Sequence, residues 1–518
     1  MAKNMEKKQA QVLPNRIESL CDNAVFWLLA AALFIIPLFF NIKSYDQFEM
    51  PKLTVLRILT SLMLGLWLVK SINKGRFEWV STPLDFPMLA WTGLNLLTTF
   101  TSLAPFLSFR GEYENFAGSL SNINYVILYF IASQFIRDKK QVFGLAYAIL
   151  LSGLFTGIYS MMQFSGSDII KWNAESMIKG RYFASMGNPN FLGALLIMII
   201  PVNIAFITIA VREKKFLFSG LLFLLFILLY VSLFGTQSRG PFLGFAFSIL
   251  AMLGYAALAG YRALKSGLPE GQNSPAEVLA AFLRKYSKWL LLLAGLLSIS
   301  LILSLTLGRN ATQRLWSSIT NIRKSLQVSR LNIWVPALKM IRDYPLLGTG
   351  VDTFKTVFPK FSGTDFANID GANVSSRTAH NEPLNIAATM GLPSLGVYFL
   401  LLWTYSRMWL RGFSRTQDFR EKTMSLALYS AFIAYFVQNL FSFGVCAINT
   451  ALYIFMAMHF ALYRQHFGVQ THSLYFPDFI KNDATKGVLY TLAAASAVLL
   501  SSRAYTLYAA DVAYNRVK

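Results

Sequence analysis

The chain has 518 residues, of which 55% are hydrophobic, 15% aromatic and only 14% charged. An average soluble domain carries about a quarter charged residues, so this composition excludes an ordinary soluble protein and indicates one that crosses a membrane many times. The formal net charge of +22 would also suit a nucleic-acid-binding protein. The basic residues, however, lie in short segments between apolar runs, which is typical of membrane topology, and we therefore expect no nucleic-acid partner.

Apolar runs of the length of a membrane span recur along the whole chain. About twenty apolar residues cross the hydrocarbon core as a helix. We therefore predict an all-α polytopic membrane protein with about 12–13 transmembrane helices, the first and fourth of them short. The predicted spans are residues 24–40, 53–69, 84–103, 123–136, 142–164, 191–211, 216–234, 242–260, 289–307, 384–403, 424–443, 447–463 and 487–507.

The charges between the spans predict their orientation. Clusters such as Lys70/Lys74/Arg76 and Arg137/Lys139/Lys140 alternate with loops that are poor in basic residues, which places the clusters in the cytoplasm by the positive-inside rule. The predicted parts are a cytoplasmic tail, nine spans, an extracytoplasmic loop, three further spans, and a cytoplasmic loop with the last span and C-terminal tail: residues 1–23, 24–307, 308–383, 384–463 and 464–518. Thirteen spans would place the C-terminus outside, and twelve would place it inside.

The extracytoplasmic loop is where we expect the chemistry, because long loops without a function are uncommon. One apolar helix face is predicted over Leu315, Ile319, Ile322 and Leu326, and a second amphipathic helix from Arg330 to Arg342. Basic amphipathic helices of this kind lie on the membrane surface.

Three residues stand out at the predicted outer boundary: Arg239 in a turn between two spans, Arg330 at the start of the second amphipathic helix, and His380 just before the tenth span. Each alone has an ordinary explanation, as a snorkelling arginine, a solvated arginine and a capping or surface histidine. Together they suit glycosyl transfer from a lipid diphosphate. Arginine pairs bidentately with phosphate, and histidine can accept a proton from an attacking hydroxyl near neutral pH.

Metal chemistry is not expected. The four histidines lack the spacing of zinc ligands, and Cys21 and Cys446 are predicted at opposite ends of the membrane. We therefore expect no metal site, no other cofactor and no disulfide.

Motifs around these residues resemble the O-antigen ligase and polymerase superfamily of bacterial membrane glycosyltransferases over about residues 105–460. The strongest match is His380-Asn381 followed after nine residues by Gly391-Leu-Pro-Ser-Leu-Gly396, although Ser394 stands where the family commonly has glycine. Further matches are Arg330-x3-Trp334, Pro345-x2-Gly348-x-Gly350 and Ser238-Arg239-Gly240. Weaker ones are Gly187-Asn-Pro-Asn190 and Tyr113-Glu114 with Gly118.

The resemblance implies a fold similar to the all-helical GT-C membrane glycosyltransferases, with a large outer loop that caps a cavity. It implies that Arg239 and Arg330 bind the diphosphate of an undecaprenyl-linked glycan and that His380 is the general base for a sugar, lipid or protein hydroxyl. The reaction would invert the anomeric carbon without a metal, on the outer face of the bacterial cytoplasmic membrane. It would serve O-antigen, lipopolysaccharide or other surface-polysaccharide biosynthesis in the cell envelope, as a ligase or a polymerase. Secondary candidates are Arg377, Asn381 and Trp334.

A transporter or flippase for lipid-linked oligosaccharides is the main alternative. Transporters tend to place ionisable groups at mid-membrane and to consist of repeated halves. Arg57 is the main charged residue inside a predicted span, and no clear internal repeat is present. A structural scaffold is a third reading, but it would leave the basic and histidine residues of the outer loop without a role. The sequence therefore favours an enzyme.

Overall fold

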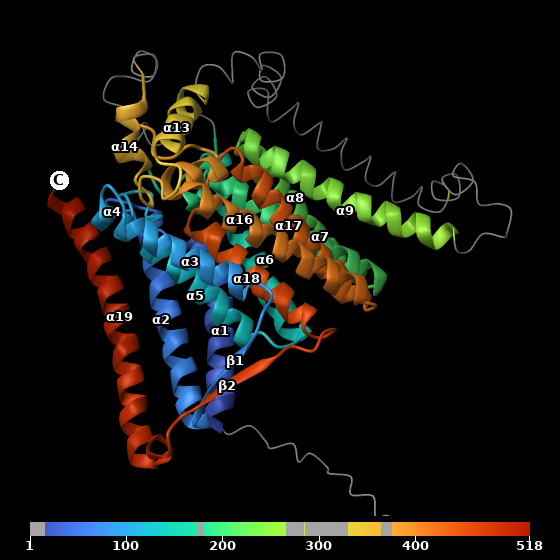
Figure 1. Cartoon of the computed structure of the whole chain (residues 1–518). Coiled ribbons are helices and arrows are strands. Elements are labelled where there is room, and N and C mark those ends of the chain that lie inside the picture. Colours follow the sequence, from blue (N-terminus) through green and yellow to red (C-terminus); the bar gives the residue numbers. More distant parts are fainter. Residues whose placement is uncertain (1–15, 173–180, 266–283, 285–329, 364–374, 518) are drawn as a thin grey trace, which may run out of the picture.

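The structure is a computed structural model that describes residues 16–172, 181–265, 284, 330–363 and 375–517. The described chain is helical apart from one two-stranded sheet (Figure 1). The helices are α1 (Arg16–Leu38), α2 (Glu49–Lys74), α3 (Asp85–Phe100), α4 (Pro105–Arg110), α5 (Ser119–Phe135), α6 (Lys139–Phe164), η1 (Ala184–Met186), α7 (Pro189–Arg212), α8 (Phe216–Gly235), α9 (Arg239–Lys265), α13 (Leu331–Asp343), α14 (Phe354–Phe361), α16 (Glu382–Arg415), α17 (Phe419–Asn439), α18 (Cys446–Tyr463), η2 (Asp478–Lys481) and α19 (Asp483–Val517).

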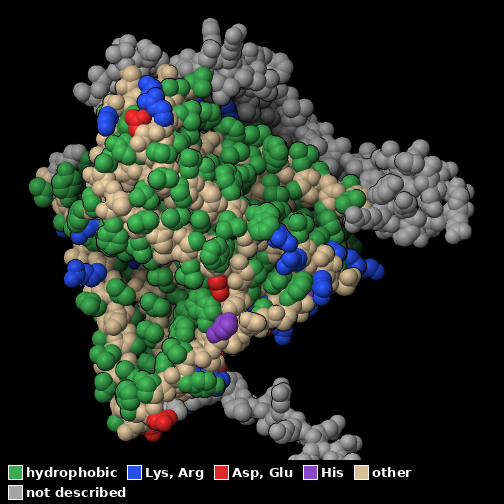
Figure 2. Space-filling model, viewed as in Figure 1, with side chains coloured by type: hydrophobic (Ala, Val, Ile, Leu, Met, Phe, Trp, Pro, Cys, Tyr) green, Lys and Arg blue, Asp and Glu red, His purple; other side chains and the backbone are tan. Residues whose placement is uncertain are grey.

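The predicted all-α polytopic membrane fold is confirmed. Nine of the described helices are long and apolar enough to cross a membrane. Three more, α3, α5 and α17, coincide with predicted spans, but α3 and α5 have only 16 and 17 residues and α17 begins with charged residues. The predicted span at 289–307 lies outside the described residues. Figure 2 shows hydrophobic side chains over most of the visible side of the bundle, as a surface in contact with lipid requires.

The most enclosed helices form the centre of the bundle. α7 is apolar on all sides and packs against α8, α9 and α17, while α18 packs against α5 and α16. A helix that is hydrophobic all round is expected where neighbours cover every side. α19 lies at the edge against α2 (Figure 1). Small residues bring these two helices close, since a methyl group at Gly65 would lie 3.0 Å from the Cβ of Ala497.

The sheet was not predicted from the sequence. β1 (Arg76–Val80) pairs antiparallel with β2 (Thr471–Tyr475), with Arg76 opposite Tyr475. β1 follows α2 and β2 precedes α19, so the pairing places these two connections on one side of the bundle, which we call the sheet face.

The opposite side, the loop face, carries α4, α13, α14 and the C-terminal end of α19 (Figure 1). There, near the end of α19, the carboxylate of Asp511 accepts hydrogen bonds from the Asp46 amide at 3.2 Å and from the Tyr113 hydroxyl. α19 therefore runs from the sheet face to the loop face.

The amphipathic helix predicted from Arg330 to Arg342 is present as α13, which ends before Tyr344 and Pro345. The short helix α14 was not predicted. Buried apolar residues join α13, α14 and α16 in a small core of their own, which includes Ala337, Met340, Phe354, Phe358 and Ala388. The apolar face predicted over Leu315–Leu326 lies outside the described residues.

α16 is kinked at Gly391, where the backbone is non-helical with φ 82° and ψ 171°. A kink interrupts the helical hydrogen bonds and leaves nearby backbone groups in need of partners. The turn after α13 supplies them through three backbone hydrogen bonds: Thr349 N to Ala388 O at 3.2 Å, Gly350 N to Thr389 O at 2.8 Å, and Leu392 N to Pro345 O at 2.8 Å. The kink thus fixes the α13 turn to the first part of α16.

Candidate active site

His380 lies directly before α16 in a left-handed backbone conformation, with φ 48°. This conformation is strained for a residue with a side chain and persists only where the surroundings hold it. The His380 amide donates to Thr378 Oγ1 at 3.2 Å, and the Trp334 indole donates to the Ala379 carbonyl at 3.0 Å. Trp334 of α13 therefore holds the backbone next to His380.

Asn381 holds the other side of His380. Its side-chain oxygen caps α16 by accepting from the Leu384 amide at 2.9 Å. Its amide group donates to the Leu440 carbonyl at 3.1 Å, in the connection between α17 and α18. Both secondary candidates thus contact backbone that positions the histidine.

The His380 ring lies 5.7 Å, centroid to centroid, from the ring of Phe443. Burial, together with the positive charges of Arg330 and Arg377, lowers the pKa of His380 to about 4. The imidazole is therefore neutral near pH 7 and has a nitrogen that can accept a proton.

Arg330 occupies the N-terminal end of α13 and is half-buried. Its guanidinium donates to the Phe441 carbonyl at 3.2 Å and lies 5.1 Å from the centroid of the Phe441 ring. Burial lowers the pKa of Arg330, and the positive charge of Arg239 lowers it further. The two arginines therefore act on one another electrostatically.

Arg239 begins α9 and is exposed. The neighbouring Gly240 lies against the end of α17, since a methyl group there would be 3.6 Å from the Cβ of Phe441. Arg239, Arg330 and His380 thus come from three segments that are distant in sequence and meet around the connection at residues 440–445.

Arg377, the third secondary candidate, is exposed and forms an ion pair with the carboxylate of Glu114. Glu114 belongs to the connection between α4 and α5. Arg377, Glu114 and His380 line the same pocket of about 470 Å³. Its other lining residues are Asn115, Asn188, Asn190, Phe191, Ile333, Ser375, Ser376, Ser442, Phe443 and Val445.

Arg181 lies beside the candidate site and was not predicted from the sequence. Its guanidinium donates to the Thr236 carbonyl at 2.8 Å and to the Ser238 hydroxyl at 2.7 Å, and lies 3.3 Å from the side-chain oxygen of Asn190. It therefore joins the turn that carries Arg239 to the beginning of α7. The available signal was a cation shortly before the Asn188-Pro189-Asn190 motif, but nothing in the sequence shows that this cation reaches the Ser238-Arg239 turn.

Asp352 was also missed. It lies in a left-handed conformation with φ 56°, and its carboxylate accepts from the Glu112 amide at 2.8 Å, the Ala117 amide at 2.9 Å and the Asn115 side chain. Burial raises the pKa of Asp352 to about 7, although these hydrogen bonds lower it. The residue ties the α4–α5 connection, and with it Glu114, to the turn between α13 and α14.

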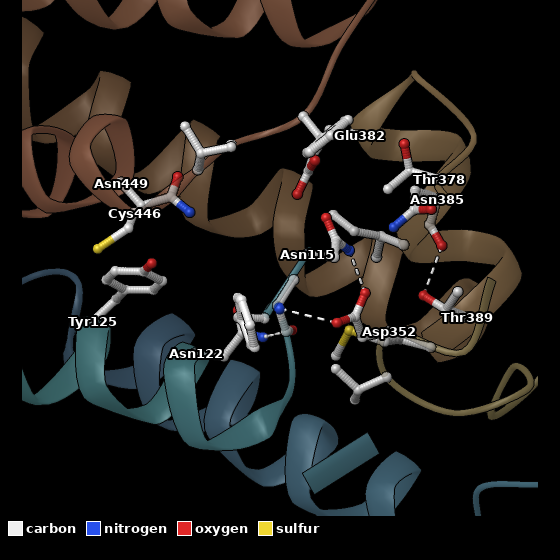
Figure 3. A pocket seen from close by; sticks show the side chains of 18 of the residues that line it. Asn115, Asn122, Tyr125, Asp352, Thr378, Glu382, Asn385, Thr389, Cys446 and Asn449 are labelled. Carbon is white, nitrogen blue, oxygen red and sulfur yellow. Dashed lines mark hydrogen bonds between the residues drawn. The ribbon is translucent and has the colours of Figure 1, made fainter. Parts of the chain in front are cut away.

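A smaller polar cavity of about 70 Å³ lies near the residues that flank His380. Figure 3 shows Glu382, Asp352 and Asn115 approaching one another there from three segments. The space is sufficient for a few water molecules, which buried polar groups of this kind commonly bind. Within the part of the chain that the structure describes, no group of three or more His, Cys, Asp or Glu side chains could hold a metal ion.

Comparison with protein families identifies residues 222–399 as matching the O-antigen ligase family. The matched segment contains Arg239, Arg330 and His380. No curated protein matches the chain as a relative. The chain is therefore a polytopic membrane enzyme that carries an O-antigen ligase family domain over residues 222–399.

Proposed function

We propose that this protein transfers a glycan from an undecaprenyl-diphosphate-linked donor to an acceptor hydroxyl on the outer face of the bacterial cytoplasmic membrane. The observation that carries the proposal is the meeting of Arg239, Arg330 and a neutral His380 at the connection between α17 and α18. Two guanidinium groups suit a diphosphate, and a neutral imidazole suits an acceptor hydroxyl.

In the proposed reaction the acceptor oxygen attacks the anomeric carbon of the donor sugar while its proton passes to His380. The bond between that carbon and the diphosphate oxygen breaks, and undecaprenyl diphosphate leaves with both electrons. Arg239 and Arg330 offset the negative charge that develops on the leaving oxygen. A single displacement inverts the anomeric configuration, and no step requires a metal or an acid because diphosphate is already a good leaving group.

Donor binding also strengthens the base. The positive charges of Arg330 and Arg377 contribute to the low pKa of His380. A diphosphate bound by Arg330 would offset part of that charge, and an anion near an imidazole favours its protonated form. The proposed order is therefore donor first, which makes His380 basic enough to accept the proton of the acceptor.

The pocket beside His380 suits a sugar acceptor. Amide and hydroxyl side chains such as Asn188, Asn190 and Ser375 supply both hydrogen-bond donors and acceptors, and Phe191 and Phe443 supply apolar surface. The acceptor would distinguish a ligase from a polymerase, since a ligase transfers the glycan to a lipid or protein and a polymerase transfers it to another lipid-linked glycan.

The test is release of polyprenyl diphosphate by the purified protein in liposomes with a lipid-linked glycan and candidate acceptors. We expect His380→Ala to reduce the rate about 10²–10⁴-fold, as for loss of a general base. Arg239→Ala should reduce it about 10²–10³-fold, as for loss of a preorganised charge. The matched controls are His472→Ala on the exposed strand β2 and Arg411→Ala at the exposed far end of α16, which should retain activity.

EDTA should leave the rate unchanged. A longer glycan on the carrier would identify a polymerase, and a new lipid or protein conjugate a ligase. The proposal would be wrong if no acceptor supported release while the donor crossed the bilayer equally fast with the unchanged protein and with the His380→Ala variant, which is the behaviour of a flippase.

A further inference from the structure

A second pocket, of about 460 Å³, lies on the sheet face, on the other side of the bundle from His380. Its lining combines five cationic side chains with one carboxylate and an apolar border. We call it the basic pocket. The residues that line it are Trp67, Lys70, Ser71, Lys74, Arg76, Glu78, Val80, Gln134, Phe135, Arg137, Arg464, Val469 and Thr471.

Four separate parts of the fold build this pocket. The last turns of α2 supply Lys70 and Lys74, the connection between α5 and α6 supplies Arg137, and Arg464 follows the last residue of α18. The β1–β2 pair covers one side. Because these segments are distant in sequence, the pocket is a product of the fold rather than a run of basic residues in one loop.

Carboxylates already engage four of the five cations. Asp22 binds Lys70 at 2.5 Å and Arg137 at 2.9 Å. Glu78 binds Lys74 at 2.5 Å and Arg76 at 2.7 Å. Glu18 also lies 3.8 Å from Lys74, so three acids pair with four of the five cations and the cluster keeps a surplus of positive charge.

Arg464 is the fifth cation. Within the described residues its guanidinium has no hydrogen-bond or ion-pair partner, and only its backbone amide is bonded, to the Phe460 carbonyl at 2.9 Å. Burial lowers the pKa of Arg464 to about 10, the positive charge of Arg137 contributes, and the negative charge of Asp138 opposes the shift. A half-buried guanidinium among other cations is costly without an anion, because its charge is only partly hydrated.

The pocket lies where the headgroups of a membrane would be. Arg464 directly follows the end of α18, and the pocket contains the last turns of α2, both of which are candidate spans. Its inner border is aromatic, with Trp67 and Phe135. Basic pockets between transmembrane helices at the headgroup level are suited to anionic lipids, whose phosphate is held while the tails remain in the hydrocarbon.

We propose that the basic pocket binds the phosphate of an anionic phospholipid, with Arg464 as its principal ligand. The fork of donors on arginine matches phosphate oxygens and permits two parallel hydrogen bonds. The lipid would join α2, α5 and α18 at the sheet face. This site is independent of the proposed glycan transfer.

The test compares the full-length protein with Arg464→Gln, which keeps the size and polarity of the side chain and removes its charge. Arg411→Gln is the matched control, because Arg411 is an exposed arginine at the end of α16 and does not line the pocket. Binding would be measured by titrating phosphatidylglycerol into protein in a neutral detergent, with thermal unfolding and native mass spectrometry as readouts. Phosphatidylcholine and inorganic phosphate at equal ionic strength form the other arms.

We expect phosphatidylglycerol to raise the unfolding temperature and to remain bound in the mass spectrum. Arg464→Gln should weaken its binding about 10- to 100-fold, the effect of losing hydrogen bonds to a charged group, while Arg411→Gln should not. Equal stabilisation by inorganic phosphate would overturn the lipid as the ligand and indicate a soluble phosphate compound. Retained phosphatidylglycerol binding in Arg464→Gln, or no binding to the unchanged protein, would overturn the site.

Discussion

His380 combines two properties that oppose one another in catalysis. Its low pKa keeps the ring neutral and ready to accept a proton, but a group with a pKa of about 4 is a weak base near pH 7. The low pKa results from burial and from the positive charges of Arg330 and Arg377. A bound anionic donor would offset the effect of these two charges but not the effect of burial. The donor would therefore contribute to catalysis through its charge as well as its leaving group.

The pH dependence of transfer checks this account. The folded pKa of His380 lies below the ordinary value of about 6.5, so the neutral form persists as pH falls and is lost only near pH 4. We expect kcat/KM for the donor, which reports the free enzyme, to stay level from about pH 8 to about pH 5.5 and to decline below that. The kcat profile, which reports the loaded enzyme, should decline at a higher pH.

The same reasoning predicts the effect of Arg377. Removing one of the charges that lower the pKa, as in Arg377→Gln, should move the acid limb of kcat/KM to higher pH. A limb near pH 6.5 in the unchanged protein, or the same limb for kcat and kcat/KM, would contradict the proposed electrostatic role of the two arginines.

Arg181 provides a further prediction. Because it holds the turn that carries Arg239, we regard it as a positioning residue. Arg181→Ala should reduce kcat/KM about 10- to 100-fold, chiefly through a higher KM for the donor, since the hydrogen bonds lost are those of a charged group. Arg181→Lys should restore part of the activity, and Arg110→Ala, an exposed arginine of α4, should change neither constant. An unchanged donor KM in Arg181→Ala would exclude this role.

At the scale of elements, the kink of α16 explains why position 391, in the motif that begins at His380, is a glycine. A Cβ at Gly391 would overlap the carbonyl oxygen of Leu346, and its φ of 82° disfavours any other residue. Gly396, the second glycine of that motif, has open space around it. The first glycine therefore has a packing role in the attachment of the α13 turn, and the second does not.

This difference predicts opposite effects of one substitution at two positions. Gly391→Ala should lower the free energy of unfolding by about 1–3 kcal/mol and detach the turn next to His380, so that activity falls as well. Gly396→Ala, inside a helix, should be neutral or raise stability by up to about 1 kcal/mol. Thermal unfolding in detergent measures both. Equal destabilisation by the two substitutions would show that the kink does not depend on Gly391.

Local pattern predicted the elements better than their contacts. The spacing of apolar residues predicted α13 almost to the residue, because amphipathicity is a local property and Pro345 ends the pattern. It did not predict α14, which has only eight residues. The predicted spans correspond to helices wherever the structure describes them, since the membrane demands long apolar runs whatever their neighbours are.

Contacts between distant segments could not be predicted. Asp352, Arg181 and the strand pair β1–β2 each depend on partners far away in the chain, and their local sequences resemble ordinary turns or loops. The sequence points to Arg239, Arg330 and His380 because together they suit transfer from a lipid diphosphate and because they lie in motifs that resemble a known family. Their meeting around residues 440–445 had no signal in the sequence.

At the scale of the whole molecule, long-range contacts on the two faces relate the helices to one another. The β1–β2 pair joins the end of α2 to the chain before α19 on the sheet face. Asp511 joins the far part of α19 to residues 46 and 113 on the loop face. If the proposed site is extracytoplasmic, the end of α19 must be extracytoplasmic too, and the basic pocket must be cytoplasmic.

Cysteine labelling of intact cells tests this arrangement. The two native cysteines, Cys21 and Cys446, are buried, so their background reaction with a membrane-impermeant maleimide should be low. New cysteines at exposed positions report each face: Lys360→Cys on α14, Arg516→Cys near the end of α19, and Ser473→Cys on β2.

We expect the cysteines at positions 360 and 516 to react in intact cells and the cysteine at 473 to react only after the membrane is opened. The reason is physical: α19 is 35 residues long and apolar enough to span, so its two ends lie in different compartments. Reaction of the cysteine at 473 but not of the cysteine at 360 would show that the orientation is the reverse of the expected one and that the proposed site is cytoplasmic. Reaction at 473 and 516 from the same side would mean that α19 does not cross the membrane at all.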